Sequence, residues 1–190
     1  MDSESIGRLF QAAAKGDAAA WKALVERLSP LVWSVARAHG LSDADACEAY
    51  QTTWFRLAQH LDRIRDPERV STWLATTARN ECLKLIRSGR KLVASDTESF
   101  ERIPDDRTPE SVFIEDEEAR DEAERHRQLW QAFRELGDKC QQLLRVLIGS
   151  PPHSYQEAAA ALGLAIGSIG PMRQRCLRQL RLLLTGGGNS

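Results

Sequence analysis

The chain has 190 residues, 42% of them apolar, and a formal net charge of −1, which suits one or two modest globular cores. No stretch approaches the roughly 18 consecutive apolar residues of a membrane span, and the N-terminus lacks the basic-then-apolar pattern of a secretory signal, so we expect a cytoplasmic protein without membrane insertion. The balanced net charge excludes a uniformly basic nucleic-acid binder but leaves room for local cationic faces.

Capping residues, prolines and apolar spacing predict four helices in the first ninety residues. Asp17 can cap a helix over AAAWKALVERL, and Pro30 can open a second helix over LVWSVARAHG. Ser42 or Asp43 opens a long helix that reaches Leu61. The apolar spacing in these segments predicts helices that share a core.

The fourth predicted helix starts near Asp66-Pro67 or Ser71, runs to about Ser88 and has two chemically different faces. One face carries an ordinary core stripe, which is Leu74, Ala78, Cys82 and Leu85. The other face combines an aromatic ring, an amide and cations, and it consists of Trp73, Thr76, Asn80, Lys84 and Arg87 with Arg79 beside them. Such a set is typical of surfaces that hold unstacked bases along a phosphate backbone. In the alternative interpretation, the tryptophan packs against a neighbouring helix and the cations are simply solvated.

Energies limit what this face can do alone. Stacking on an aromatic ring gives about 1 to 3 kcal/mol per base, whereas opening about ten base-pair steps of DNA costs roughly 14 kcal/mol at about 1.4 kcal/mol per step. One tryptophan can therefore capture one or two extruded bases. A larger partner must hold the rest of an open bubble.

A linker is predicted over residues 93–125, which are poor in large apolar side chains and carry Pro104 and Pro109. From Asp96 to Glu124 there are thirteen acidic residues against three arginines. The sequence shows no convincing β-strand pattern. We therefore expect an all-α fold of two small helical domains joined by a flexible acidic linker, with domains at residues 1–92 and 126–185 and a tail at residues 186–190.

The second domain is predicted to contain helices around LWQAFREL and CQQLLRVLIG, followed by a helix-turn-helix. Ser154 and Glu157 have the spacing of a capping box, and Gly163 ends the helix that they open. The small Ala159, Gly163 and the apolar Ile169 fall where two helices pack closely across a tight turn. The second helix of this pair is predicted to be capped by Ser168.

This second helix has a core face and a cationic face. Its apolar stripe is Ile169, Met172, Cys176, Leu180 and Leu183, and the opposite side carries Gln174, Arg175, Arg178 and Arg181. From Ser168 to Leu184 there are four arginines and no acidic residue. In a DNA major groove, the first residues of such a helix meet base edges and the later arginines meet phosphates. The alternative is a solvated arginine face on an ordinary surface helix.

The cysteines and histidines give no sign of a metal or catalytic site. Cys47, Cys82, Cys140 and Cys176 form no C-x-x-C pair, and no histidine lies at zinc-ligand spacing, so buried free thiols are expected. The chain also lacks a glycine-rich phosphate loop and a nucleophile motif. We expect no metal, no cofactor and no enzymatic activity.

Three strings carry a resemblance to a known family: QTTW at residues 51–54, WLATTARNECL at residues 73–83 and GSIGPMRQRCL at residues 167–177. The segments around them resemble the second and fourth conserved regions of extracytoplasmic-function sigma factors, which belong to the sigma-70 family. The resemblance covers most of the chain outside the linker and tail. It implies a subunit that directs core RNA polymerase to promoter DNA, assists promoter opening and is held inactive by an anti-sigma partner.

The resemblance also implies roles for individual residues. The loop at residues 66–71 and the helix that follows would read and melt the minus-10 element, through Trp73, Thr76, Arg79, Asn80, Lys84 and Arg87. The later helix would read the minus-35 element, through Ser168, Arg173, Arg175 and Arg178. The clamp of the largest polymerase subunit would be bound by Asp45, Glu48, Gln51, Trp54 and Arg56. The linker would thread towards the RNA exit path.

Two other classes of protein compete with this interpretation. A free-standing helix-turn-helix regulator binds its operator without polymerase, usually as a symmetric dimer, and nothing in the sequence resembles a dimerisation element. A protein-interaction module would tolerate charge removal at Arg175 and Arg178 without loss of transcription.

Overall fold

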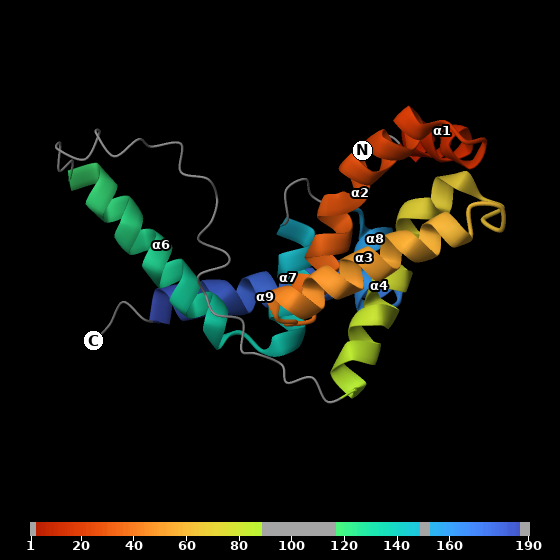
Figure 1. Cartoon of the computed structure of the whole chain (residues 1–190). Coiled ribbons are helices and arrows are strands. Elements are labelled where there is room, and N and C mark those ends of the chain that lie inside the picture. The colour runs from red at the N-terminus through yellow and green to blue at the C-terminus, as the bar shows by residue number, and fades with distance from the viewer. Residues whose placement is uncertain (1–2, 89–116, 149–152, 187–190) are drawn as a thin grey trace.

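The computed structural model describes residues 3–88, 117–148 and 153–186, and the regular elements in these ranges are all helical (Figure 1). The first range holds α1 (Ser3–Ala14), α2 (Ala18–Ala38), α3 (Asp43–Gln59), the 3-10 helix η1 (Pro67–Arg69) and α4 (Val70–Arg87). The other two hold α6 (Glu117–Glu135), α7 (Asp138–Ile148), α8 (Tyr155–Leu162) and α9 (Ile166–Gly186). The expected all-α class is confirmed. Within these ranges, no helix is long and apolar enough to cross a membrane.

α1 was missed by the sequence analysis, although its pattern is readable. Ile6, Phe10 and Ala13 recur at helical spacing and are all buried. They lie on the side of α1 that packs against α2 and η1. The helix therefore covers one end of the first block, which is the group of helices in residues 3–88.

The predicted break at Pro30 is wrong, because α2 runs through this residue from Ala18 to Ala38. Proline removes one helical hydrogen bond and usually kinks or ends a helix. Here Leu24, Leu28 and Leu31 continue one fully buried stripe across the proline, so tertiary packing outweighs the lost bond. The predicted cap at the start is confirmed, since the Asp17 carboxylate accepts from the amides of residues 19 and 20.

Caps fix the next elements close to their predicted positions. Ser42 caps α3, which ends at Gln59, two residues before the predicted end. Asp66 accepts a hydrogen bond from the Glu68 amide at the start of η1, and α4 follows directly.

The predicted linker is helical at its C-terminal end. Residues 117–125 belong to α6, which projects away from the rest of the molecule in Figure 1. Side-chain pairs one turn apart support this acidic helix, because Glu124 accepts from Arg127 and from Gln128. The remainder of the predicted linker, residues 93–116, lies outside the described residues, as do residues 187–190 of the tail.

The helix-turn-helix has its predicted turn but a different second cap. Ser154 and Glu157 form the capping box of α8, and Gly163 ends it in the left-handed conformation at φ 67°. α9 already begins at Ile166, so Ser168 is not its cap. The Ser168 hydroxyl instead donates to the Ala165 carbonyl at 2.7 Å.

The prediction of free thiols is wrong for two of the four cysteines. Cys140 of α7 and Cys176 of α9 form a disulfide, although 36 residues separate them. The sequence contains no motif for this pair, and only the packing of α7 against α9 brings the two thiols together. Cys82 is free and buried as expected, whereas Cys47 is free but exposed.

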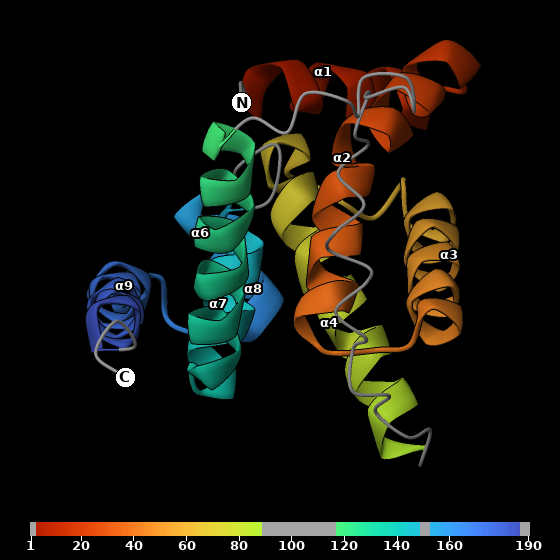
Figure 2. The same ribbon diagram turned by 90° about the vertical axis from the view of Figure 1, so that its left-hand side faces the viewer.

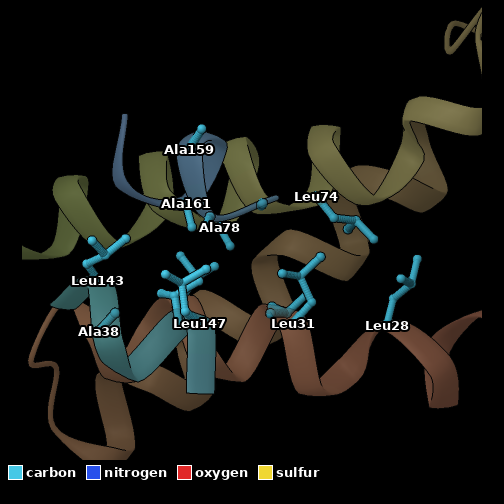
Figure 3. Packing of buried hydrophobic residues seen from close by; sticks show 14 of the residues in the cluster. Leu28, Leu31, Ala38, Leu74, Ala78, Leu143, Leu147, Ala159 and Ala161 are labelled. Carbon is cyan, nitrogen blue, oxygen red and sulfur yellow. The ribbon is translucent and has the colours of Figure 1, made fainter. Parts of the chain in front are cut away.

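The first block and the second block, which holds α6 to α9, share one core instead of forming separate ones. α8 packs directly against α4, and α7 packs against α2; Figure 2 shows α7 and α8 beside the helices of the first block. In Figure 3, side chains of all four packing helices point towards one another, namely Leu28, Leu31, Ala38, Leu74, Ala78, Leu143, Leu147, Ala159 and Ala161. Small alanines on α4 and α8 allow this close approach.

Candidate nucleic-acid interface

A pocket of about 290 Å³ lies between the outward side of α4 and the C-terminal end of α3. Its lining combines aromatic, amide and charged groups, and consists of Arg56, His60, Trp73, Thr77, Asn80, Glu81, Lys84 and Arg87. Three of these groups are cations and one is a carboxylate. Four of the six residues that were predicted on this face, Trp73, Asn80, Lys84 and Arg87, are thus brought to one concave surface.

Trp73 both packs against the core and lines the pocket. It is half-buried and packs partly against the core, with its ring centroid 6.3 Å from that of His60. It also lines the pocket, where an incoming ring can reach it. The packing fixes the orientation of an aromatic surface that remains partly accessible.

Glu81 is the residue that the sequence analysis missed. Its side chain is 8% exposed, and its Oε1 lies 2.9 Å from Arg56 Nε and 3.0 Å from Lys84 Nζ. Burying a carboxylate costs free energy unless it is paired, and here two cations share it. The Lys84 half of this group has a readable signal in the spacing of three residues on one helix, but Arg56 comes from α3.

The two other residues of the predicted face do not line the pocket. Thr76 is exposed, and its hydroxyl donates back to the Thr72 carbonyl at 2.9 Å. The Arg79 guanidinium points to α8 instead: a Cβ at Gly163 would lie 2.6 Å from it. Any substitution at Gly163 must therefore displace Arg79 as well as strain a left-handed turn.

α9 presents the two predicted faces. Ile169 and Cys176 are buried, and the rest of the predicted apolar stripe packs partly against the core, namely Met172, Leu180 and Leu183. Arg175 and Arg178 are exposed on the other side, Arg173 is exposed at the edge of the apolar stripe, and Ser168 is half-buried. Within the described residues, the cationic side of α9 is open to solvent.

The residues predicted to bind the polymerase are divided between surface and interior. Glu48 and Gln51 are exposed on α3, and Asp45 is half-buried and accepts from the Ser42 hydroxyl at 3.0 Å. Trp54 is 7% exposed and packs edge-on against Trp21 and Tyr50, so its ring belongs to the core.

Arg56 faces Glu81 and the pocket. Phe55, which the sequence analysis did not single out, is 63% exposed. It lies seven and four residues after Glu48 and Gln51, on the same face of α3.

Burial shifts the pKa of three groups, of which His39 lies at the contact between the blocks. Desolvation lowers the pKa of His39, whose Nε2 lies 3.1 Å from the Ala161 carbonyl, while that hydrogen bond raises it and Arg79 lowers it further. Burial also lowers the pKa of His153, opposed by Glu157, and raises the pKa of the Cys82 thiol to about 12. None of these groups is set up as a nucleophile or a metal ligand, and the described residues contain no cluster that could hold a metal ion.

Residues 24–92 match the family described as sigma-70 region 2, a span that includes α3, α4 and every residue lining the pocket. The chain therefore contains a sigma-70 region 2. The resemblance stated from the sequence is thereby confirmed. No protein of curated function matches the chain in sequence.

Two solved structures are similar to this chain over most of its length. CnrH, in complex with the cytosolic domain of CnrY, is 23% identical at a TM-score of 0.60, with 98% of this chain and 99% of that one covered. The sigma factor RpoE, in complex with the anti-sigma factor NepR from Bartonella quintana, is 23% identical at a TM-score of 0.53, with 86% and 96% covered. At these identities the likeness is one of fold.

Proposed function

We propose that the chain is an extracytoplasmic-function sigma factor, which directs core RNA polymerase to specific promoters and assists promoter opening. The observation that carries the proposal is the sigma-70 region 2 match over residues 24–92, which contains the pocket beside Trp73. The protein supplies binding surfaces, and the polymerase carries out the chemistry.

The minus-10 element is read by the pocket on α4. Trp73 offers a stacking surface for an extruded base, and the Asn80 amide can donate to and accept from a base edge. Lys84 and Arg87 hold the phosphates of the melted strand. Arg79 and Thr76 lie beside this surface, and Arg79 becomes available only if α8 leaves α4.

The minus-35 element is read by α9. Its exposed Arg175 and Arg178 lie on a helix face without acidic residues, with the exposed Arg173 nearer the apolar stripe, and this cationic surface suits the major groove. Ser168 is half-buried and its hydroxyl donates to the Ala165 carbonyl, so we assign it to stabilising the turn and not to contacting bases.

The polymerase-binding face lies on α3. We place it on Glu48, Gln51 and Phe55, with Asp45 at its edge. An exposed phenylalanine flanked by polar groups is typical of a protein contact surface. Trp54 supports this face from the core, and Arg56 serves the pocket.

The packing of the blocks implies that the described arrangement opens during function. Elements centred at minus 10 and minus 35 are about 25 base pairs apart, which is about 85 Å of duplex at about 3.4 Å per base pair. α8 lies against α4, and only three residues separate the end of α8 from the start of α9, so α9 begins close to α4. Residues 93–125, partly helical, then connect two domains at residues 1–92 and 126–185 that separate on polymerase.

An anti-sigma factor is the expected regulator. CnrH and RpoE were each solved with a protein partner, and for RpoE that partner is an anti-sigma factor. A partner that binds the closed arrangement keeps the DNA-facing surfaces too close together for a promoter. Copurification and a genetic screen without any inhibitory partner would remove this part of the proposal.

Start-site mapping tests the function. Fragmented genomic DNA of the source organism is transcribed by sigma-free core polymerase with and without the protein, and RNA 5′ ends are mapped. We expect new discrete starts that share two upstream elements at fixed positions. Tight sequence-specific DNA binding by the protein alone, without new starts, would instead identify a polymerase-independent regulator.

A further inference from the structure

The Cys140–Cys176 disulfide joins α7 to α9, the helix that carries the exposed arginines. Of the 21 residues of α9, all of which the structure describes, two are buried, namely Ile169 and Cys176. The rest of its apolar stripe is only partly covered. The disulfide is therefore one of two buried anchors that fasten α9 to its neighbours.

This anchor gains importance when the two blocks separate. α8 packs more extensively against α4 than against α7 or α9, and α7 also packs against α2. Separation removes both contacts with the first block, and α9 must then be held by α6, α7 and α8 alone. The three helices α7, α8 and α9 together span only residues 138–186. A hydrophobic core of this size is marginal by itself, and disulfides commonly reinforce it.

The bond encloses a long segment and can be reached from one side. Its two cysteines are 36 residues apart, so the closed loop contains α8 and the turn that leads to α9. A disulfide restricts the unfolded chain, and its stabilising effect increases with the length of the loop. Cys140 is half-buried whereas Cys176 is fully buried, so a reagent in solution reaches the bond through Cys140.

The proposed function favours a reversible bond over a permanent one. A protein that works with RNA polymerase on promoter DNA acts inside the cell, where thiols are kept reduced. Disulfides that form in that environment are usually transient and sense the redox state. We therefore expect this pair to alternate between a disulfide and two thiols.

We propose that the Cys140–Cys176 pair is a redox site that keeps α9 in position on the separated second block, so that the oxidised protein reads the minus-35 element and the dithiol form reads it poorly. The inference rests on the proposed function and adds a means of regulating it. The reduced protein stays folded while its blocks are packed together, because the first block then supports α7 and α8. The difference between the two forms therefore emerges on the polymerase.

The oxidant is a low-molecular-weight disulfide, and the reaction is two successive thiol–disulfide exchanges. The Cys140 thiolate attacks one sulfur of the oxidant, which forms a mixed disulfide and expels one thiolate. The Cys176 thiolate then attacks Cys140 Sγ and expels the second thiolate. Two protein thiols are oxidised, the oxidant is reduced to two thiols, and the two thiol protons pass to the expelled thiolates. A dithiol reductant reverses both steps.

The test compares initiation by the oxidised and the reduced protein. The full-length protein is treated with glutathione disulfide or with dithiothreitol, and excess reagent is removed. Its thiols are counted by maleimide labelling and mass spectrometry. Each form is then combined with core polymerase on a promoter that has both elements. We expect reduction to lower initiation by about tenfold or more, because a disulfide commonly contributes more free energy than a tenfold change requires.

Two variants and one structural measurement make the comparison specific. Cys140→Ser cannot form the bond and should initiate equally after either treatment, at the level of the reduced natural protein. Cys47→Ser removes the exposed free thiol of α3 and should keep the full ratio between the oxidised and reduced forms. Hydrogen exchange of residues 166–186 in the holoenzyme should be faster in the reduced natural protein, which links the loss of initiation to α9.

Three outcomes overturn the inference. Labelling finds no disulfide in the oxidised protein, the two forms of the natural protein initiate equally, or the difference persists in Cys140→Ser. In each case, initiation at discrete promoters by the natural protein leaves the proposed function standing. Absence of initiation by both forms, with folded protein, removes the proposed function itself.

Discussion

Trp73 illustrates how one side chain serves the core and a ligand surface together. Its packing beside His60 restricts its rotamers before any base arrives, so stacking costs little additional side-chain entropy. The ring is therefore more effective than a freely exposed tryptophan. The substitution that removes the ring should affect promoter opening more than it affects polymerase binding.

Trp73→Ala should slow open-complex formation by roughly 5- to 150-fold, the equivalent of the about 1 to 3 kcal/mol that stacking gives per base. Trp73→Phe retains a ring and should lose much less. Opening is measured with permanganate, and polymerase binding with a competition assay against the natural protein. Equal opening by Trp73→Ala and the natural protein would remove Trp73 from the site.

His39 makes stability depend on pH. Its pKa in the folded protein is lowered from 6.5, so the folded state binds its proton less readily than the unfolded state. Above about pH 6.5 the residue is neutral in both states and costs nothing. As the pH falls from about 6.5 through the lowered folded pKa, the free energy of unfolding should decrease.

His39→Gln keeps a donor for the Ala161 carbonyl but does not titrate. Urea unfolding at about pH 7.5 and about pH 5.5 should show a smaller loss of stability in this variant than in the natural protein. His153, whose pKa is also lowered, accounts for part of the remaining loss. An unchanged pH dependence in His39→Gln would contradict the assignment.

Residue-level prediction succeeded where the signal is local and failed where it depends on tertiary contacts. Spacing along one helix placed Trp73, Asn80 and Lys84 on a common face. It could not show that Arg79 turns to Gly163, or that Glu81 pairs with a residue of α3. These contacts depend on how α4 meets α8 and α3, which the sequence periodicity does not encode.

At the scale of elements, the helix N-caps were more predictable than how far each helix extends. Ser42, Asp17 and the Ser154 capping box all stand where expected. The helix through Pro30 and the helical residues 117–125 were missed, because buried packing and side-chain pairs override the local preferences for a break or a linker. The Cys140–Cys176 disulfide was missed for the same reason.

α9 allows a prediction about salt. If Arg175 and Arg178 each hold a phosphate, Arg175→Ala and Arg178→Ala should each reduce the slope of log affinity against log salt by about one unit for promoter binding by the holoenzyme. Arg134→Ala, which removes an exposed arginine of α6, is the control and should leave the slope unchanged. Slopes unaffected by either α9 substitution would show that its arginines are merely solvated.

At the scale of the whole molecule, the shared core is the feature that the sequence analysis missed. Apolar stripes on α2, α4, α7 and α8 predict burial but do not state which helices bury one another. The sequence pattern predicts that the alanines of α8 pack inside the helix-turn-helix. In the structure, α8 also packs against α4. A closed molecule and an extended promoter can be reconciled only if the blocks separate.

Separation can be measured by energy transfer between dyes. One dye is placed on the exposed Cys47 of α3 and the other on Gln179→Cys of α9. We expect high transfer in the free protein and a large loss on binding core polymerase. A pair within the first block, Cys47 with Lys22→Cys, should not change, and constant transfer in an active holoenzyme would contradict the opening.

The most direct test of the account is a spacer series on a mapped promoter. Inserting five base pairs between the two upstream elements turns one of them by about half a helical turn relative to the other, at about 10.5 base pairs per turn. The account predicts that the five-base-pair insertion abolishes initiation with this protein. A ten-base-pair insertion restores the rotation of the two elements but lengthens the spacer, so initiation recovers only as far as the two blocks can separate. Initiation that follows either element alone, at any spacing, would contradict a sigma factor that reads both elements through α4 and α9.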